Sequence, residues 1–143
     1  MSLTHEHASP RTGVEVSVVM PCLNEEATVE ACVAGAREGL ARLGVTGEIL
    51  VADNGSADRS VALARAAGAR VVHVRERGYG SAYRGGFSAA RGRILVMGDS
   101  DDTYDFSRLD ELVRPLRDGA ADMVLGSRLR GQISPGAMPW LHR

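Results

Sequence analysis

Residues 16–26 read VSVVMPCLNEE. The apolar run Val16–Met20 is typical of a buried strand, and it ends at Pro21. The two glutamates that follow fall where the first turn of a helix is expected, with Asn24 as its N-cap, since carboxylates are favoured at a helix N-terminus. This stretch therefore predicts a strand followed directly by a helix, the repeating unit of an α/β protein.

The same strand–helix scheme continues along the chain. Apolar residues that step by four and three predict that the first helix runs to Gly44. Further short apolar runs predict strands at residues 48–52, 69–74, 93–98 and 122–126. Nearly continuous apolar strands that alternate with helices predict an α/β fold, in which helices cover both faces of a mostly parallel sheet.

Three further helices are expected between and after these strands. Ser56 is the expected N-cap of a helix that runs toward Gly68, and another helix follows the glycine-rich loop 78–80. The last helix begins near Ser107. Pro115 is expected to kink or shorten it, because proline lacks the amide hydrogen that a helix interior uses.

Composition narrows the possible functions. The chain has 143 residues, of which 44% are hydrophobic and 24% charged, a balance that suits one globular domain. A net charge of -1 and few aromatic residues argue against a nucleic-acid partner. All 17 basic residues are arginine, which excludes phosphate loops and Schiff-base sites that depend on lysine.

No segment of the sequence is typical of a membrane-spanning helix. The longest apolar runs, at 49–52 and 94–97, are far shorter than the roughly 20 residues that such a helix needs. Residues 1–14 are polar, without the apolar core of a signal peptide, and are expected to form a disordered tail. The expected location is the cytoplasm, while a longer parent protein could associate with a membrane.

Carboxylates follow three of the expected strands. In parallel α/β sheets, ligands bind beyond the carboxyl ends of the strands, and Glu25, Asp53 and the acidic loop 99–102 all fall there. A simple cap or turn is an equally good interpretation of Asp53. The three aspartates of the acidic loop repel one another unless a cation or a donor compensates. Oxygen ligands of this kind suit Mg²⁺ or Mn²⁺, which would also bind a diphosphate.

Five motifs together resemble a known family. In chain order they are Pro21-Cys22-Leu23-Asn24-Glu25-Glu26, Asp53-Asn54-Gly55-Ser56-Ala57-Asp58, Gly78-Tyr79-Gly80-Ser81-Ala82, Asp99-Ser100-Asp101-Asp102 and Gly126-Ser127-Arg128. The series resembles the family 2 glycosyltransferases of GT-A fold, a Rossmann-like three-layer sandwich. It is most similar to the dolichyl- or polyprenyl-phosphate hexose synthase branch, and the resemblance runs from Val16 to the end of the chain.

The resemblance implies an activity and a set of ligands. The activity is transfer of a hexose, with inversion, from a UDP- or GDP-linked sugar to an acceptor such as a polyprenyl phosphate at a membrane surface. A Mg²⁺ or Mn²⁺ ion would assist the departure of the diphosphate. By the same resemblance, residues 15–143 form the nucleotide-sugar-binding domain and lack the acceptor-binding part.

The resemblance also implies roles for individual residues. The D-x-D pair would be Asp99 on the nucleotide side and Asp101 on the metal, and both are candidate catalytic residues and metal ligands. The nucleotide sugar would be bound by residues of all five motifs and by an arginine just after the third, namely Pro21, Leu23, Asn24, Glu25, Asp53, Asn54, Gly80, Arg84, Asp99, Ser100 and Arg128.

Two other functions stay open. If the acceptor-binding part is absent, the chain could bind nucleotides without turnover. A sugar nucleotidyltransferase is the other alternative, but it would need a basic, glycine-rich loop where this chain has Pro21–Glu25. A sheet cut off after its fifth strand would leave an unpaired edge or an uncovered face, so self-association is also expected.

Overall fold

The chain folds around a four-stranded parallel sheet in a computed structural model that describes residues 13–126. The strands are β1 (Val16–Cys22), β2 (Gly47–Asp53), β3 (Arg70–His73) and β4 (Ile94–Met97), in the order β3-β2-β1-β4. Every adjacent pair is parallel, which confirms the predicted sheet.

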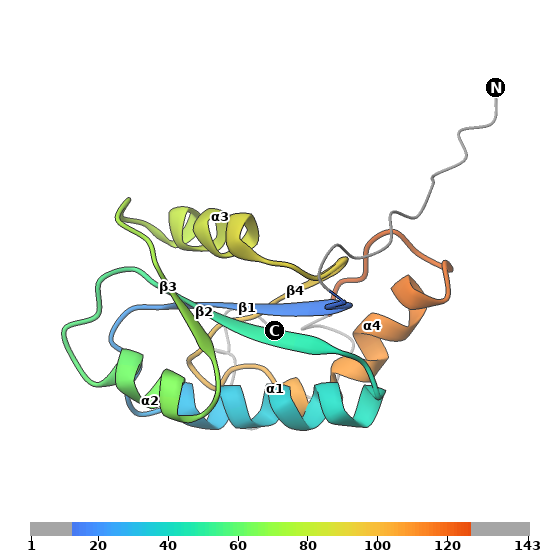
Figure 1. The fold of residues 1–143 in the computed structure, drawn as a ribbon, viewed down its shortest axis with the longest axis horizontal. Helices are drawn as coiled ribbons and strands as arrows, with labels where there is room; N and C mark the ends of the chain where they lie inside the picture. The colour runs from blue at the N-terminus through green and yellow to red at the C-terminus, as the bar shows by residue number, and fades with distance from the viewer. Residues whose placement is uncertain (1–12, 127–143) are drawn as a thin grey trace, which may run out of the picture.

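Helices cover both faces of this sheet. They are α1 (Val29–Leu43), α2 (Ser60–Ala66), α3 (Tyr79–Ala89) and α4 (Leu109–Arg117), with a short 3-10 helix at Phe106–Arg108. Figure 1 shows α3 on one face of the sheet and α1, α2 and α4 on the other. The result is the expected three-layer α/β arrangement. No helix within residues 13–126 combines the length and the apolar character needed to span a membrane.

The larger core lies between the sheet and α1. Strand β1 is buried along its whole length, and α1 packs on it through Val29, Val33, Ala36 and Leu40. These are positions that the helical periodicity predicts. A smaller cluster under α3 contains Val19, Leu50 and Tyr83.

The register of the strands brings their carboxyl ends together. Cys22 of β1 is level with Asp53 of β2, which is level with His73 of β3. Strand β4 stops earlier, since its last residue, Met97, is level with Val19. The acidic loop after β4 therefore passes beside the last residues of β1, and all four strand-end loops meet at one edge of the sheet.

Two helices begin later than predicted. Asn24 has a φ of 57°, so it turns the chain in the left-handed region and does not cap a helix; α1 begins at Val29. Ser56 does not cap α2 either, because that helix begins at Ser60, where Asp58 accepts a hydrogen bond from the backbone amide at 2.9 Å. In both cases the residue predicted as a cap bonds to the neighbouring loop instead.

The predicted fifth strand is wrong. Residues 122–126 form no strand, and Met123 and Leu125 are 72% and 76% exposed. An apolar run needs a hydrogen-bonding neighbour to become a strand, and within the described residues this segment has none. The preceding helix α4 ends two residues after Pro115, as predicted.

Candidate functional site

A cavity of about 320 Å³ opens where the strand-end loops meet. Seven residues that the sequence singled out line it: Pro21, Leu23, Glu25, Asn54, Asp99, Ser100 and Asp101. They come from the ends of β1, β2 and β4, the edge at which the parallel-sheet rule places a ligand. Asp53 and Asp101 follow strands that end at this same edge.

Four other predicted residues lie outside the lining. The side chains of Asn24 and Asp53 accept hydrogen bonds from loop amides. No heavy atom lies within 4 Å of the position that a Cβ at Gly80 would take, and Arg84 forms an exposed ion pair with Glu76. Arg128 falls outside the described residues, as does most of the tail predicted at 1–14. The structure therefore brings part of each of the first four motifs to the cavity, and none of these motifs lines it completely.

The loops after β1 and β2 are bonded to each other. Asn24 donates its backbone amide to Ser56 Oγ (3.0 Å), and its side-chain Oδ1 accepts from the amide of Ala57 (2.8 Å). Next to these bonds, the amide of Glu25 donates to Ser60 Oγ at 2.8 Å. These contacts fix one wall of the cavity, and they explain why polar residues at 24 and 56 resemble helix caps without being caps.

Asp53 closes a tight turn beneath the cavity. Its carboxylate is 3% exposed and accepts hydrogen bonds from the amides of Gly55 (3.3 Å) and Ser56 (3.1 Å) and from His73 Nδ1 (3.1 Å). Burial acts to raise the pKa of Asp53, but the bonds from Ser56, His73 and Gly55 outweigh it and hold the pKa below its usual value. Asp53 is therefore ionised at neutral pH and anchors the turn.

Asn54 fixes the loop that follows β3. Its Nδ2 donates to the carbonyls of Val74 (3.1 Å) and Glu76 (2.8 Å), while its Oδ1 accepts from the amide of Gly78 (2.9 Å). Three of the four hydrogen-bonding positions of the side-chain amide are used in this way. The amide side chain is thus well suited to the position, and an aspartate could not donate to the two carbonyls.

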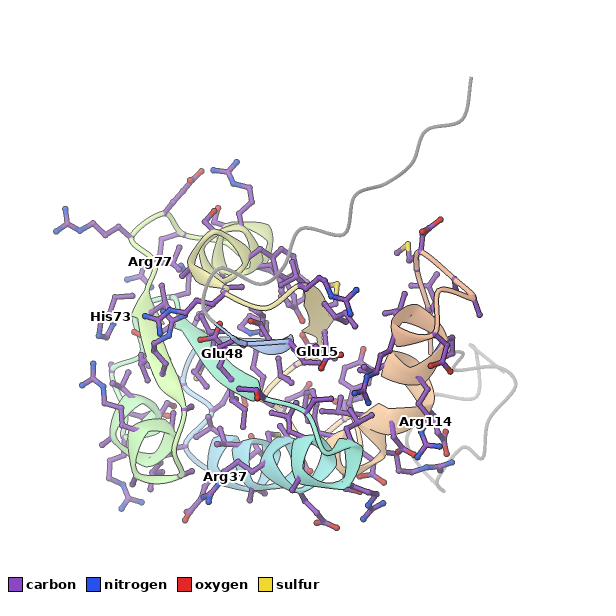
Figure 2. All side chains as sticks on the ribbon, turned by 45° about the vertical axis from the view of Figure 1, so that its right-hand side comes forward. Glu15, Arg37, Glu48, His73, Arg77 and Arg114 are labelled. Carbon is purple, nitrogen blue, oxygen red and sulfur yellow. The ribbon has the colours of Figure 1, made fainter. Side chains whose placement is uncertain are left out.

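Arg77 is a lining residue that the sequence analysis missed. Its NH1 donates to the carbonyl of Asn54 at 2.8 Å, and the guanidinium lies so close to Gly55 that a Cβ there would be 2.9 Å from it. Figure 2 shows Arg77 and His73 near one end of the strands and Glu15 near the other. The position of Arg77 directly before the glycine loop could have indicated its role, whereas the resemblance indicated Arg84.

Charge is unevenly distributed around the cavity. Glu25, Asp99 and Asp101 contribute carboxylates, and Arg77 is the one cation among its described lining residues. Cys22, Gly78, Tyr79 and Ala82 complete the lining, and they belong to the first and third motifs. A ligand that carries both phosphates and a divalent cation would match both signs of charge.

The acidic loop is a structured turn bound to β1. Ser100 is buried; its Oγ donates to the carbonyl of Pro21 (2.7 Å), and its own carbonyl accepts from Thr28 Oγ1 (2.6 Å). Asp101 Oδ1 accepts from the amide of Thr103 at 3.0 Å, and Asp102 turns the chain with a φ of 63°. Ser100 thereby places the aspartates on either side of it at the cavity wall.

Two tyrosines contact the first aspartate of the pair. Asp99 Oδ1 accepts from the hydroxyls of Tyr79 (2.8 Å) and Tyr83 (3.0 Å). Burial and the neighbouring Asp99 carboxylate both raise the pKa of Tyr79 and, more strongly, that of Tyr83, so both hydroxyls stay protonated donors at neutral pH.

The donor set fits a metal that arrives together with a diphosphate. Within residues 13–126, no three His, Cys, Asp or Glu side chains converge as a complete metal site. Mg²⁺ does not require such a cage, because it is usually held by one or two carboxylates, several waters and the phosphates of the substrate. Asp99 and Asp101, which both line the cavity, could supply those carboxylates.

The family model described as glycosyl transferase family 2 matches residues 17–143. Among characterised relatives, the low-salt glycan biosynthesis hexosyltransferase Agl6 of Haloferax volcanii is 46% identical over 89% of this chain. A dolichyl-phosphate hexose transferase of the same organism is 34% identical over 90% of it. This chain spans 30% and 54% of the lengths of these two relatives.

The fold also matches solved structures. Glucosyl-3-phosphoglycerate synthase of Mycobacterium tuberculosis, in complex with Mn²⁺, UDP-glucose and phosphoglyceric acid, aligns with a TM-score of 0.57 and 32% identity. The alignment covers 75% of this chain and 40% of that one. The parallel sheet, the loops at its carboxyl edge and the family match lead to one conclusion: the chain belongs to glycosyl transferase family 2.

Proposed function

We propose that this chain binds the nucleotide sugar for an enzyme that transfers a hexose from a UDP- or GDP-linked donor to an acceptor. The observation that carries the proposal is the cavity in which Asp99 and Asp101 lie together with Arg77. A transferase site needs to hold a diphosphate and to compensate its growing charge as the sugar leaves. Arg77 can do this directly, and the two carboxylates can do it by holding a divalent cation.

Asp101, with Asp99 in a secondary role, would hold a Mg²⁺ or Mn²⁺ ion. When bound, the ion would act as a Lewis acid that neutralises charge on the departing diphosphate, a contribution of several kcal/mol. Support for a metal comes from the Mn²⁺ in the similar solved structure and from the carboxylate pair itself. Arg77 would add a fixed positive charge to the same diphosphate.

The other lining residues would hold the nucleotide. Pro21, Leu23 and Glu25 line the cavity from the end of β1 and the loop after it, while Asn54 and Gly78 line it from the loops after β2 and β3. Leu23 is an exposed apolar side chain at the mouth of the cavity, where it could pack against a nucleobase or ribose. Asp53 would act from beneath by holding the turn that carries Asn54 and Gly55.

The acceptor is proposed to be a lipid phosphate such as a polyprenyl phosphate. One relative is named a dolichyl-phosphate hexose transferase, and the motif series resembles that branch. A phosphate acceptor is already an anion, so its oxygen could attack the anomeric carbon from the face opposite the diphosphate without a strong general base. Such an attack would invert the configuration at that carbon.

Calorimetry with UDP, GDP and AMP, each with Mn²⁺ and then with a chelator, tests the binding proposal. UDP or GDP should bind in the presence of Mn²⁺ and bind more weakly with the chelator, while AMP, which lacks a diphosphate, should bind more weakly in both. Equal binding of all three nucleotides, or none, would contradict the proposal.

A second candidate function is nucleotide binding without turnover. The observation that favours it is coverage, because the chain spans 30% of one relative and 40% of the solved synthase. If the acceptor-binding residues lie in the part of those proteins that is not matched, the 143 residues should bind nucleotide yet transfer no sugar. A radiolabelled transfer assay onto a polyprenyl phosphate distinguishes the two, and turnover by these residues would contradict this candidate.

A further inference from the structure

The start of α3 carries a pair of tyrosines that the proposed chemistry does not yet use. Tyr79 and Tyr83 are four residues apart and therefore lie on the same side of the helix. Their rings meet edge to face, with centroids 5.0 Å apart, and Tyr83 stacks on Phe87 at 5.5 Å. Tyr83 is 5% exposed, whereas Tyr79 is 61% exposed and lines the cavity.

Both hydroxyls converge on one oxygen atom. Tyr79 donates to Asp99 Oδ1 at 2.8 Å and Tyr83 donates to the same Oδ1 at 3.0 Å. A carboxylate oxygen has about two lone-pair positions, so two donors saturate Oδ1. Within residues 13–126, no hydrogen bond reaches the other oxygen, Oδ2.

This geometry restricts what Asp99 can do. With Oδ1 occupied, the carboxylate can bind an external ligand through Oδ2 only, so it would bind a metal or a hydroxyl group through one oxygen and not two. It is also restrained in rotation, because two hydroxyls on a packed helix hold the same atom. Asp101 Oδ1 also accepts two hydrogen bonds, from the amide and the hydroxyl of Thr103, but both donors belong to its own loop and not to a packed helix.

We propose that Tyr83 and Tyr79 are positioning residues that fix Asp99 so that Oδ2 alone faces the nucleotide–metal ligand. The inference rests on the proposed function of the cavity, and it adds two residues that position one of the carboxylates. Tyr83 is the permanent anchor because its ring is buried between Tyr79 and Phe87. Tyr79 is the adjustable member, since its ring is exposed at the cavity and its hydroxyl can exchange with water.

The alternative is that Tyr83 only fills space under α3. Replacing tyrosine with phenylalanine separates the two, because the ring and its packing stay while the hydroxyl is lost. Phe87→Leu is the matched control: it disturbs the same aromatic cluster and removes no hydrogen bond to Asp99.

The experiment is calorimetry, in which binding of UDP and of GDP is measured at increasing Mn²⁺ concentration. It compares the unchanged full chain with the single variants Tyr83→Phe, Tyr79→Phe, Phe87→Leu and Asp99→Ala and with the double variant Tyr83→Phe/Asp99→Ala. Tyr83→Phe should weaken Mn²⁺-dependent nucleotide binding about fivefold, and Tyr79→Phe about twofold to threefold. Phe87→Leu should lower the melting temperature and leave this affinity unchanged. In the Asp99→Ala background, Tyr83→Phe should have no further effect, because a residue that acts through Asp99 cannot act without it.

Three outcomes overturn the inference. If Asp99→Ala weakens binding but Tyr83→Phe does not, the tyrosines are structural and the proposed function stands. If Tyr83→Phe has the same effect with and without Asp99, it acts through folding or packing. If Asp99→Ala itself has no effect, the positioning role fails, whereas the proposed metal site is tested separately by Asp101→Ala.

Discussion

Asp101 and Asp102 are neighbours in the sequence, yet they belong to different surroundings. Asp101 lines the cavity, whereas Asp102 turns the chain in the left-handed region and lies beside Cys32 and Thr103 on the α1 side. The spacing of the acidic loop could predict a cluster of carboxylates. Which of them faces the cavity depends on Ser100 and its bond to Pro21, a contact between residues 79 positions apart.

Replacing Asp101 should therefore weaken nucleotide binding. In Asp101→Ala, affinity for UDP or GDP with Mn²⁺ should fall at least about tenfold, or roughly 1.4 kcal/mol, because a proposed metal ligand is lost. Asp102→Asn is the matched control from the same loop, since asparagine tolerates the left-handed backbone. Calorimetry measures both variants, and equal losses would mean that only the net charge of the loop matters.

A second pair of variants compares two arginines. Arg77 lines the cavity, while Arg84 forms an exposed ion pair with Glu76. We expect Arg77→Ala to lower diphosphate affinity about tenfold and Arg84→Ala to leave it within about twofold. Comparing UDP with uridine in both variants checks that the loss involves the phosphates; a larger effect of Arg84→Ala would restore the role that the sequence suggested for it.

The turn at Asp53 gives a pH-dependent prediction. Because the folded protein lowers the pKa of Asp53, its contribution to stability is present above the unfolded pKa of roughly 4 and is lost as the pH falls through the lower, folded value. Asp53→Asn should lower the free energy of unfolding by about 1–2 kcal/mol at pH 7. Urea unfolding from pH 7 to pH 3 should show this difference shrinking toward acid, and a constant difference would exclude ionisation as its cause.

At the scale of elements, the four observed strands were predictable, whereas the starts of α1 and α2 were not. Strand β1 and most of β2 are buried, so their apolar composition is a local signal that the sequence displays directly. The residues predicted as caps, Asn24 and Ser56, are polar because they bond to each other's loops. No pattern within either segment distinguishes these two uses, since the partner lies 32 residues away.

The packing of α3 on the sheet depends on a close approach at Gly86. A Cβ at this position would be 2.4 Å from Val19 Cγ1, so alanine there must push the helix away from β1. Gly86→Ala should destabilise the protein by about 1–3 kcal/mol and weaken nucleotide binding, because α3 carries the two tyrosines that contact Asp99. Gly80→Ala is the control within the same helix, since nothing lies within 4 Å of its Cβ position. Thermal unfolding should show a lower melting temperature for Gly86→Ala than for Gly80→Ala, and equal melting temperatures would contradict the importance of the close approach at Gly86.

At the scale of the whole molecule, β4 is an edge strand. It pairs with β1 on one side, and no strand within residues 13–126 pairs with its other side. Leu95 and Met97 are exposed on the face that α3 leaves open. The sequence suggested an unpaired edge or an uncovered face, and within residues 13–126 β4 has both.

We therefore expect self-association of these 143 residues through β4. Sedimentation velocity should show a concentration-dependent increase in mass, and Leu95→Glu/Met97→Glu should shift the protein toward the monomer, because charged side chains disfavour edge-to-edge pairing. The paired control is Glu30→Gln on the outer face of α1, which should change nothing. A monomer at all concentrations would contradict the expectation.

The position of β1 between β2 and β4 also has a consequence for synthesis on the ribosome. When residues up to β3 have emerged, β1 has its first neighbour, but the acidic loop and its bond to Pro21 do not yet exist. A nascent chain of that length can begin to collapse, but it lacks the acidic loop through which the proposed metal would hold a nucleotide. Metal-dependent nucleotide binding should thus start only after the residues following β4 leave the exit tunnel. From then on, bound nucleotide would stabilise completed chains relative to partly folded ones.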